Sequence, residues 1–587
     1  MRNFIFDNFP FLENDFDALT DYQLFCKMIA YVKKVAITNK TFVDNLDNKL
    51  DEMYQNGQLE NLITQYLELQ NTYTYDSVSA MKSATNLIAN SFTRTSGFNS
   101  YNDGGGSFYK VREKTSEDVS DEKTLIDLQN NLVAELIIIN TLDVRQLGIF
   151  PSSDNTNDFN GIADILNSLN PLTLIINGNY VIGDTITWEN LSDMIIQFKG
   201  LITAKSYENT EKPIFTLENC NNITINDYNV TSTLDKIEPA PAGHVRESYL
   251  GSCRIGIKLQ DCENIYLNNC KFNNMYWDLY PHGTSSLERT KNIYIKNTIS
   301  RNASIPLYGS YLDGVYIDNY DCIPKEELGG GNHIFYFSHY SDNIDLNRLK
   351  ISSDGYLGNA IQFNNAMSAP YNNISIRNSN IDGTALTALL TSVNNMTIDN
   401  VTFNLVDGLS QSIDEQIIQI KSGNVKISNS TFNNHNIRLL RLNNDCNCFI
   451  DNIVHNMTQE DSNNQLFAFG SGDFNNVSLK VNNSYIKCQT LLYNGKVNNI
   501  QFSNCNIYTT TDDYFQSSRN SDSEVIYHNC YIKFKNNVDF SYNGNNEYSN
   551  TVKILGCFLY GYKDLSNINN DSTFVVVNSF KNNSLIS

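Results

Sequence analysis

The sequence predicts a mainly β protein, a right-handed parallel β-helix preceded by an N-terminal α-helical region. The first observation is a recurring unit in which Asn precedes an Ile-x-Ile strand and a second Asn follows it. Clear copies begin at Asn222, Asn264, Asn292, Asn373, Asn395, Asn424 and Asn499. Such internal repetition is typical of a solenoid, in which each repeat buries its core only against its neighbours.

The second observation is the spacing of these copies. Ile374 and Met396 are 22 residues apart, and Met396 and Val425 are 29 apart. A further alternating strand lies between copies, as in the segment from Ala360 to Phe363. Two or three short strands in each ~22–30 residues match one coil of a β-helix. A leucine-rich solenoid is the main alternative, but the variable coil length and the use of Ile, Val and Phe disfavour it.

The third observation is the alternation within each unit. It places Ile265 and Leu267 inside and Tyr266 outside, because successive strand side chains face opposite sides. We expect the Asn residues at the turns, since Asn tolerates the left-handed conformation. A small residue recurs at one position of several coils, which predicts an inward stack. It is Cys270, Cys505, Cys530 and Cys557.

We expect three regions: helical residues 1–70, a mixed linker at 71–142, and the β-helix at 143–580. Phe42, Leu46 and Leu50 begin an apolar stripe of helical spacing. The stripe needs a partner, either the same monomer or other copies in a bundle, and both possibilities stay open. Two strands around a glycine turn are predicted in 91–111. The glycines at 104–106 are not followed by the Lys-Ser/Thr of a P-loop, which disfavours a phosphate-binding loop.

The start of the β-helix should carry a cap. The segment 143–171 predicts a strand from Asp143, then a capped helix from Asn155, before a further strand at 172–182. A helix here would shield the open end of the solenoid. The repeat is interrupted later, since Ile223 and Ile265 are 42 residues apart. We therefore expect inserted loops at 231–345, the first around Glu238 to Gly251.

Composition excludes several classes of function. The net charge is −22 and the pI is about 4.7, which argues against nucleic-acid binding. No run of about 18 apolar residues predicts a membrane span, and the first residues lack a secretory signal. We expect synthesis in a cytoplasm, where the twelve cysteines stay reduced. Cys446 and Cys448 are too close for a zinc site, so no metal and no cofactor are predicted.

The irregular window is where we expect chemistry, because sites are usually built on loops of a regular scaffold. It holds four of the seven histidines and one of the two tryptophans. Aromatic rings suit sugars, and Arg or His suits anionic groups. The predicted ligand-binding residues are Trp277, Tyr280, His282, Arg301, His333 and His339.

A glycosidase needs two carboxyl groups roughly 5–9.5 Å apart, one of them kept protonated. Carboxylates one or two coils apart reach that range, because coils stack about 4.8 Å apart. Asp278, Glu288 and Asp313 are the predicted catalytic residues, with Asp354 and Asp382 further along. A lyase would instead need a base near Arg289 or Arg301. Most of the 64 acidic residues must simply face solvent.

The chain also resembles a known group of proteins. The segment from Asn8 to Leu24 is similar to the N-terminus of tail and appendage proteins from phages of low-GC Gram-positive bacteria. The stretches 81–106 and 143–148 resemble the linker that leads into their pectate-lyase-like β-helix. The nearest group is the tailspike or pre-neck appendage proteins of podoviruses.

This resemblance implies a homotrimer in the virion, made in the host cytoplasm and joined to connector or tail proteins through its N-terminus. It also implies binding of host cell-wall polysaccharide or teichoic acid during adsorption, with cleavage by a hydrolase or lyase activity. A binding-only spike of the same fold stays open. A cellular polysaccharide lyase or hydrolase is a third alternative, disfavoured by the missing secretion signal.

Overall fold

The structure is a computed structural model. It describes residues 72–205, 212–233, 254–324, 333–352, 359–364, 371–382, 388–390, 393–404, 416–420, 422–433, 438–443, 445–456, 465–469, 477–493, 499–510, 516–518, 524–538, 542–543, 551–562, 573–581 and 584–586. The predicted helical region 1–70 and the predicted insertion around Glu238 to Gly251 lie outside the described residues. The chain divides into two compact units, and the division falls between residues 139 and 149.

From residue 72 to 139, the first unit is a small sheet with the short helix α5 (Val78–Lys82). Its strands are β1 (Thr72–Tyr75), β2 (Phe92–Thr95), β3 (Phe108–Glu113), β5 (Leu132–Ile137) and β4 (Leu125–Asp127), in that spatial order. β2 and β3 pair antiparallel, which confirms the two strands predicted in 91–111. Between them, the carboxylate of Asp103 accepts backbone N–H groups of Phe98, Asn99, Ser100 and Gly105. The polar glycine turn is therefore organised by its own aspartate.

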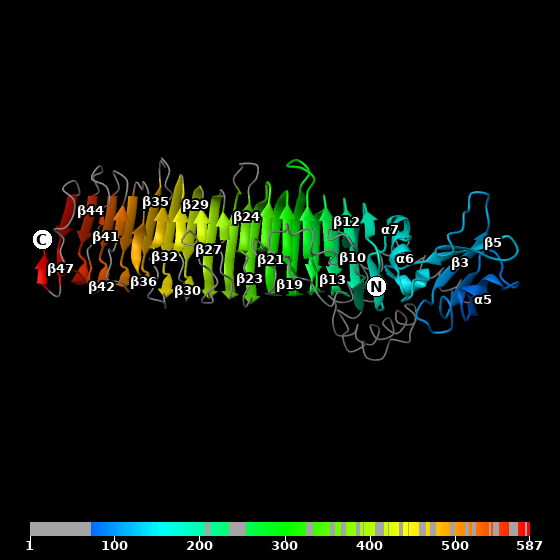
Figure 1. The fold of residues 1–587 in the computed structure, drawn as a ribbon. Helices are drawn as coiled ribbons and strands as arrows, with labels where there is room; N and C mark the ends of the chain where they lie inside the picture. Colours follow the sequence, from blue (N-terminus) through cyan, green and yellow to red (C-terminus); the bar gives the residue numbers. More distant parts are fainter. Residues whose placement is uncertain are drawn as a thin grey trace, which may run out of the picture. The chain divides into compact units, whose positions relative to one another are not determined.

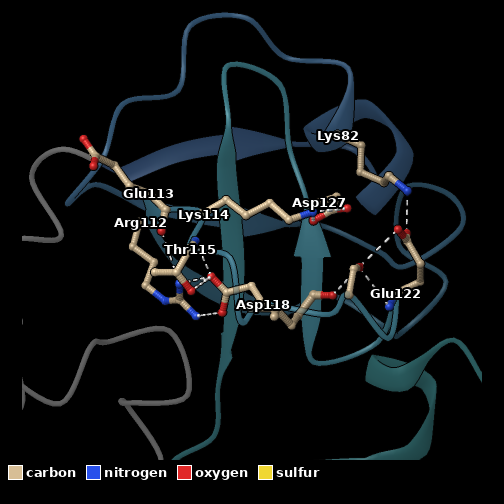
Figure 2. Close-up of polar contacts among 10 residues, drawn as sticks. Lys82, Arg112, Glu113, Lys114, Thr115, Asp118, Glu122 and Asp127 are labelled. Atoms are coloured by element: carbon tan, nitrogen blue, oxygen red, sulfur yellow. Dashed lines mark hydrogen bonds and ion pairs between the residues drawn. The ribbon is translucent and has the colours of Figure 1, made fainter.

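Ion pairs fasten the loop after β3 to this sheet (Figure 2). Arg112 donates to both carboxylate oxygens of Asp118 at 2.7 Å, and this pair holds the pKa of Asp118 well below its usual range. Lys114 lies 2.7 Å from Asp127, and Lys82 pairs with Glu122 (Figure 2). Exposed pairs of this kind contribute little individually, so they fix the path of the loop more than its stability.

The segment before the β-helix differs in part from expectation. β6 (Thr141–Asp143) ends where a strand was predicted to begin, and η2 (Val144–Leu147) follows as a 3₁₀ turn. The strand prediction from Asp143 is wrong because this residue forms a capping box with Gln146, and Gly148 ends the turn with φ 77°. Asp is a favoured N-cap residue, and Gly is favoured where the chain leaves a helix in the left-handed conformation.

The predicted cap helix is present as two short helices, α6 (Thr156–Asn160) and α7 (Ala163–Leu169). Phe159 and Leu166 are buried. Phe159 packs edge-on against Tyr180, with ring centroids 5.1 Å apart, and its carbonyl accepts a hydrogen bond from Trp188 Nε1 at 2.9 Å. Figure 1 shows both helices at the end of the stack next to β10 and β12. They shield the first coils from solvent.

The second unit is a parallel β-helix, in which each strand pairs parallel with the equivalent strand one coil later (Figure 1). One coil contributes one strand to a 14-stranded sheet and two strand segments to a larger sheet. The 14-stranded sheet consists of β9 (Ile186–Glu189), β12 (Pro213–Glu218), β15 (Ile255–Gln260), β18 (Trp277–His282), β20 (Ile305–Ser310), β22 (His333–Ser338), β24 (Asn359–Asn364), β26 (Ala388–Leu390), β28 (Gln416–Ile420), β31 (Arg438–Leu442), β34 (Gln465–Phe469), β37 (Thr490–Tyr493), β40 (Gln516–Ser518) and β43 (Tyr542–Asn543).

The larger sheet bends once in each coil. Its first segments are β7 (Thr173–Ile176), β10 (Ser192–Phe198), β13 (Asn221–Asn226), β16 (Glu263–Asn268), β29 (Gly423–Ser428), β32 (Cys446–Asp451), β35 (Ser478–Asn482), β38 (Asn499–Ser503), β41 (Glu524–His528), β44 (Thr551–Leu555) and β46 (Thr573–Val577). Its second segments are β8 (Tyr180–Ile182), β11 (Leu201–Ala204), β14 (Asn229–Ser232), β17 (Lys271–Asn273), β30 (Thr431–Asn433), β33 (Val454–Asn456), β36 (Tyr485–Cys488), β39 (Asn506–Thr509), β42 (Tyr531–Val538), β45 (Phe558–Tyr562) and β47 (Ser579–Lys581). Strands β19 (Thr290–Arg301), β21 (Leu312–Ile323), β23 (Asp342–Ser352), β25 (Ile374–Asp382) and β27 (Val393–Asn404) run through both segments. β48 (Ser584–Ile586) pairs antiparallel with β47 and covers the last edge.

The bend is made by asparagine, as predicted. Asn378, Asn400, Asn429 and Asn452 all have φ between 50° and 54°. Their side chains bond from coil to coil: Asn400 Nδ2 donates to Asn378 Oδ1 at 2.9 Å, and Asn452 Nδ2 donates to Asn429 Oδ1 at 2.8 Å. Asn enters the left-handed region at low cost, and these amide ladders also satisfy the polar groups that a bend would otherwise leave unpaired.

A small buried residue follows the bend, which confirms the predicted inward stack. Cys505, Cys530 and Cys557 lie on successive coils, and the backbone N–H of Cys530 donates to Cys557 Sγ at 3.3 Å. All of the described cysteines are buried and free. Burial raises the pKa of Cys270 to about 12, so its thiol stays protonated at neutral pH.

Inserted loops were predicted at 231–345; residues 234–253 and 325–332 of that window lie outside the described residues, so the insertions stay a prediction. Residues 254–324 and 333–352 form regular strands with continuous pairing from β15 through β23. The segment 275–289 contains strand β18, which a short turn follows. The 28 residues between Ile265 and Ile293 are simply the length of one coil. Among the described residues, no helix combines the length and apolar character needed to cross a bilayer.

Candidate functional site

A row of tyrosines lies on the outer face of the 14-stranded sheet. Tyr280, Tyr308 and Tyr336 occupy the fourth position of β18, β20 and β22, and each is half-buried. Tyr308 and Tyr336 are direct partners in the strand register. The preceding residues Leu279, Leu307 and Phe335 are buried in the core, so the tyrosines face outward.

The rings of this row pack on one another and on Trp277. Trp277 stacks on Tyr308 with centroids 4.4 Å apart and on Tyr276 with centroids 4.8 Å apart. Tyr308 stacks on Tyr336 at 5.0 Å. Both faces of the indole are thereby covered, and Trp277 is only 8% exposed. Trp277 therefore packs against the tyrosines, and its role as a ligand contact stays a prediction.

Histidines extend the row at both edges of the strands. His333 stacks on Tyr336 with ring centroids 4.8 Å apart. The Nδ1 atom of His282 lies 3.2 Å from the hydroxyl of Tyr280. Burial lowers the pKa of His282, and the charge of Lys258 adds to this effect. A neutral imidazole can both donate and accept a hydrogen bond, as recognition of a sugar hydroxyl requires.

His339 belongs to the same edge. Its Nδ1 atom lies 3.3 Å from the hydroxyl of Ser310, which is the register partner of His282. The ring of His339 stacks on Tyr311 with centroids 5.0 Å apart. The structure therefore brings together four predicted residues, Tyr280, His282, His333 and His339, around an aromatic row. We call Tyr280, His282, Tyr308, His333, Tyr336 and His339 the aromatic face.

One predicted carboxylate lies beside this face. The turn after His282 holds Thr284, whose hydroxyl is 2.8 Å from Glu288 Oε2 and 3.3 Å from Asp261 Oδ1. Glu288 is exposed and Asp261 is half-buried. Asp261 also raises the pKa of His282 in opposition to burial. Two carboxylates and an imidazole thus meet at the end of β18.

Asp278 lies elsewhere. Its side chain is fully buried in the solenoid, where the hydroxyl of Tyr320 donates to Oδ2 at 3.0 Å. Burial raises the pKa of Asp278 to about 8, and the hydroxyls of Ser300 and Tyr320 offset only part of that rise. The carboxyl is therefore neutral in much of the physiological pH range, but it has no exposed surface. The catalytic role of Asp278 stays a prediction, and any such role would have to act from inside the solenoid.

Asp313 and Arg301 belong to the larger sheet. Asp313 accepts a hydrogen bond from Asn343 Nδ2 at 2.6 Å, within the asparagine ladder. Arg301 pairs with Asp321 at 3.1 Å and donates to two backbone carbonyls. Such contacts between side chains of neighbouring coils, and from side chains to backbone carbonyls, also occur at other turns of the β-helix. The catalytic role of Asp313 and the ligand-binding role of Arg301 stay predictions.

The remaining candidates have structural contacts or lie outside the described residues. Arg289 forms an ion pair of 2.7 Å with Asp342, and both side chains are largely buried. Asp382 accepts hydrogen bonds from Asn380 and Asn404. Asp354 lies outside the described residues. Within the described ranges, no three side chains of His, Cys, Asp or Glu gather as a metal site would require.

The sequence held a signal for Tyr308 and Tyr336, which were not predicted, through their spacing from the predicted Tyr280. Tyr280, Tyr308 and Tyr336 are separated by 28 residues each, the same interval as between Ile265 and Ile293. Aligning outward positions by that interval would have placed all three tyrosines in one row. No comparable signal identified Asp261, because its proximity to Glu288 depends on the turn at Gly283.

The fold and this face define the chain as a parallel β-helix protein with an aromatic outer surface. No protein-family model matches the chain, and no curated protein matches it. One solved structure with similar architecture is a tailspike mutant of Escherichia coli bacteriophage HK620 in complex with a pentasaccharide. The two sequences are 10% identical, the match covers 79% of this chain and 85% of that chain, and the TM-score is 0.45. Likenesses this distant carry no argument about function.

Two other similar structures are a mannuronan C-5 epimerase module and a phage tailspike. The AlgE6 A-module of Azotobacter vinelandii has 12% identity, with 75% of this chain and 98% of that chain covered and a TM-score of 0.40. The tailspike of Acinetobacter baumannii bacteriophage Fri1, described as a capsular polysaccharide depolymerase, has 10% identity, with 86% and 75% covered and a TM-score of 0.23.

Proposed function

We propose that this protein is a bacteriophage tailspike or appendage protein that binds a host-surface glycan through the aromatic face. The observation that carries the proposal is the outward row of Tyr280, Tyr308 and Tyr336 flanked by histidines. Sugars offer apolar C–H faces and many hydroxyls. Tyrosine meets both needs, because it combines an apolar ring with a hydrogen-bonding tip.

The virion role rests on a separate argument. The N-terminal segment from Asn8 to Leu24 resembles phage tail and appendage proteins, and a spike of this kind is a homotrimer joined to connector or tail proteins. A host among low-GC Gram-positive bacteria would make cell-wall polysaccharide or teichoic acid the polymer. Lys258 next to His282 favours a polymer with anionic groups, since it adds a positive charge to the aromatic face.

Cleavage of the glycan would fall to Glu288 with Asp261. Retaining glycosidases hold two carboxyl groups about 5 to 5.5 Å apart, one as acid and one as nucleophile. The Glu288 and Asp261 oxygens that contact the Thr284 hydroxyl lie no more than about 6 Å apart, since they are 2.8 Å and 3.3 Å from it. Both lie beside the aromatic face, which would hold the sugar chain. Asp278 would instead support the strand from within.

The binding proposal is tested with the full chain and purified host wall polymer. The variant Tyr308→Ala/Tyr336→Ala should lose binding by at least about tenfold, because each lost aromatic contact is worth roughly 1 kcal/mol. Tyr485→Ala/Tyr508→Ala is the matched control, since it removes a comparable pair of outward tyrosines from β36 and β39 of the larger sheet. Equal loss in both variants would refute the assignment of the site.

Cleavage needs its own assay, in which the chain length of the polymer is followed over time. Glu288→Gln and Asp261→Asn should abolish shortening while binding persists. If the wild-type protein binds the polymer and never shortens it, the protein is a binding-only spike. If both variants cleave normally, the carboxylate pair is wrongly assigned.

A further inference from the structure

A second surface feature lies on the larger sheet, away from the aromatic face in the fold. A groove of about 720 Å³ crosses the outer face of β25, β27, β29, β32 and β35. Ligand sites commonly have volumes of about 300–1,000 Å³, so the groove has the size of a small-molecule or oligosaccharide site. Its outward side chains are Asn373, Ser375, Asn395, Thr397, Asn424, Lys426, Asn447, Phe449, Ser478 and Lys480.

The hollow arises from a change of side chain along one outer row. In the earlier coils this row holds Tyr266, Tyr294 and Tyr316, whose rings stack with centroids 4.7 Å and 4.8 Å apart. The row continues in register to Ser375 and Thr397, which are short. The stacked rings cover one another, whereas the short side chains leave an open trough lined by hydrogen-bonding groups.

Two lysines supply the charge of this groove. Lys426, Phe449 and Lys480 are consecutive partners in the register, so the ammonium groups stand on either side of one ring. Both lysines are exposed. In the part of the chain that the structure describes, no ion pair involves either lysine. The charge of Lys426 also acts on Asp399, but two exposed ammonium groups without an ion pair are still a local exception in a protein of net charge −22.

The acidic groups around the groove are committed to other contacts. Asp399 and Asp451 stand two positions further along the same strands. Asp399 accepts hydrogen bonds from Ser428 at 2.7 Å and Asn429 at 2.8 Å, and Asp451 accepts one from Asn483 at 2.8 Å. At the other end of the row, Asp345 pairs with Arg377. These carboxylates therefore belong to the turn ladder and to an ion pair.

We propose that this groove binds an extended acidic oligosaccharide that carries a carboxylate on every second sugar. Lys426 and Lys480 are two coils apart, about 10 Å at the usual strand spacing, which is roughly the length of two linked sugar rings. The Asn, Ser and Thr side chains would meet the sugar hydroxyls, and Phe449 would pack against one ring. This second site is independent of the aromatic face.

A second copy of the chain is a less suitable occupant. The cores of protein–protein interfaces are depleted in lysine and rich in aromatic residues, Met and Arg. This groove has two lysines, and amide and hydroxyl groups lie along its length. Its chemistry therefore fits a hydrated, anionic polymer better than a protein surface.

The test uses the full chain and calorimetric titration with a hyaluronan hexasaccharide, which bears glucuronate on every second sugar, and its carboxyl-reduced neutral counterpart. We expect the acidic ligand to bind at least about tenfold more tightly, since charge-assisted hydrogen bonds contribute more than neutral ones. Lys426→Gln/Lys480→Gln should remove that preference. Lys553→Gln is the matched control, because Lys553 is on the same row but outside the groove and pairs with Glu524.

Several outcomes would overturn the proposal. The proposal fails if the two hexasaccharides bind with equal affinity, or if neither binds at millimolar concentration. It also fails if Lys553→Gln loses the preference for the acidic hexasaccharide as fully as Lys426→Gln/Lys480→Gln does. A change in molecular mass on light scattering of the Lys426/Lys480 variant would identify the face as a subunit interface instead. The Tyr308→Ala/Tyr336→Ala variant should keep hexasaccharide binding, which separates failure of this site from failure of the proposed function.

Discussion

Replacement of Asp278 by Asn tests the account of the solenoid interior. The carboxyl is fully buried and contacts Tyr320. Burial raises its pKa from 3.8 to about 8 in the folded chain. The unfolded chain releases this proton near pH 4, whereas the folded chain keeps it to about pH 8. Between these values the unfolded state binds fewer protons, so rising pH destabilises the fold.

The size of the effect follows from the shift. Each pKa unit corresponds to about 1.4 kcal/mol, so a shift from 3.8 to about 8 corresponds to roughly 6 kcal/mol across the whole window. This value is an upper bound, because charges inside proteins behave as if the local dielectric constant were higher than that of a dry interior.

An amide at position 278 cannot ionise. Asp278→Asn should therefore gain stability relative to the wild type as the pH rises from 4 to 8.

Thermal denaturation of both proteins at pH 4.5, 6 and 8 measures this gain. All other titrating groups are common to the two chains, so the difference between their melting temperatures isolates position 278. We expect that difference to move in favour of the Asn variant by several degrees with rising pH. Parallel pH profiles would mean that Asp278 titrates normally, and the account of a neutral buried carboxyl would fail.

Three further predictions concern the framework. Arg254 is fully buried and donates to the carbonyls of Ile182, Asp184 and Pro213. Arg254→Met should therefore destabilise the first coils by roughly 3 kcal/mol or more, which a lower melting temperature would show. Arg254→Lys should also lower the melting temperature, because an ammonium group cannot replace the planar set of guanidinium donors. Asn400 has φ 54°, so Asn400→Val should lower the melting temperature more than Asn400→Gly; equal effects would contradict the role of the left-handed bend. Ten of the twelve cysteines are described and buried, so at most two thiols should react with a thiol reagent in the native protein, and labelling of Cys530 before unfolding would contradict this.

Much of the fold could be predicted because the repeat constrains it locally. Each Ile-x-Ile unit fixes which side chains enter the core, and Asn fixes the bend through its backbone preference. A strand was predicted from Asp143, but residues 144–147 form a 3₁₀ turn, because the capping box of Asp143 and Gln146 stabilises the turn against the β propensity of the segment. In the described part of the window 231–345 the coils stay in register even where the Asn-flanked motif is absent, since strands such as β20 carry other residues at the same positions.

The site was harder to predict, because it depends on which side of a strand each residue faces. Asp278 and Tyr280 are two residues apart in one strand, yet the first is inside and the second outside. The inward-facing pair Asp278 and Leu279 breaks the simple alternation at the start of β18. The sequence pattern placed the density of aromatic and histidine residues correctly. It could not show which carboxylate lies beside them, since Asp261 and Glu288 meet only through the turn at Thr284.

A structure of the full chain with a bound fragment of the host glycan tests the central claim most directly. The account predicts sugar rings along the outer face of β18, β20 and β22, in contact with Tyr280, Tyr308 and Tyr336, and with one glycosidic bond beside Glu288. A glycan bound elsewhere on the chain, with these three tyrosines untouched, would contradict the account.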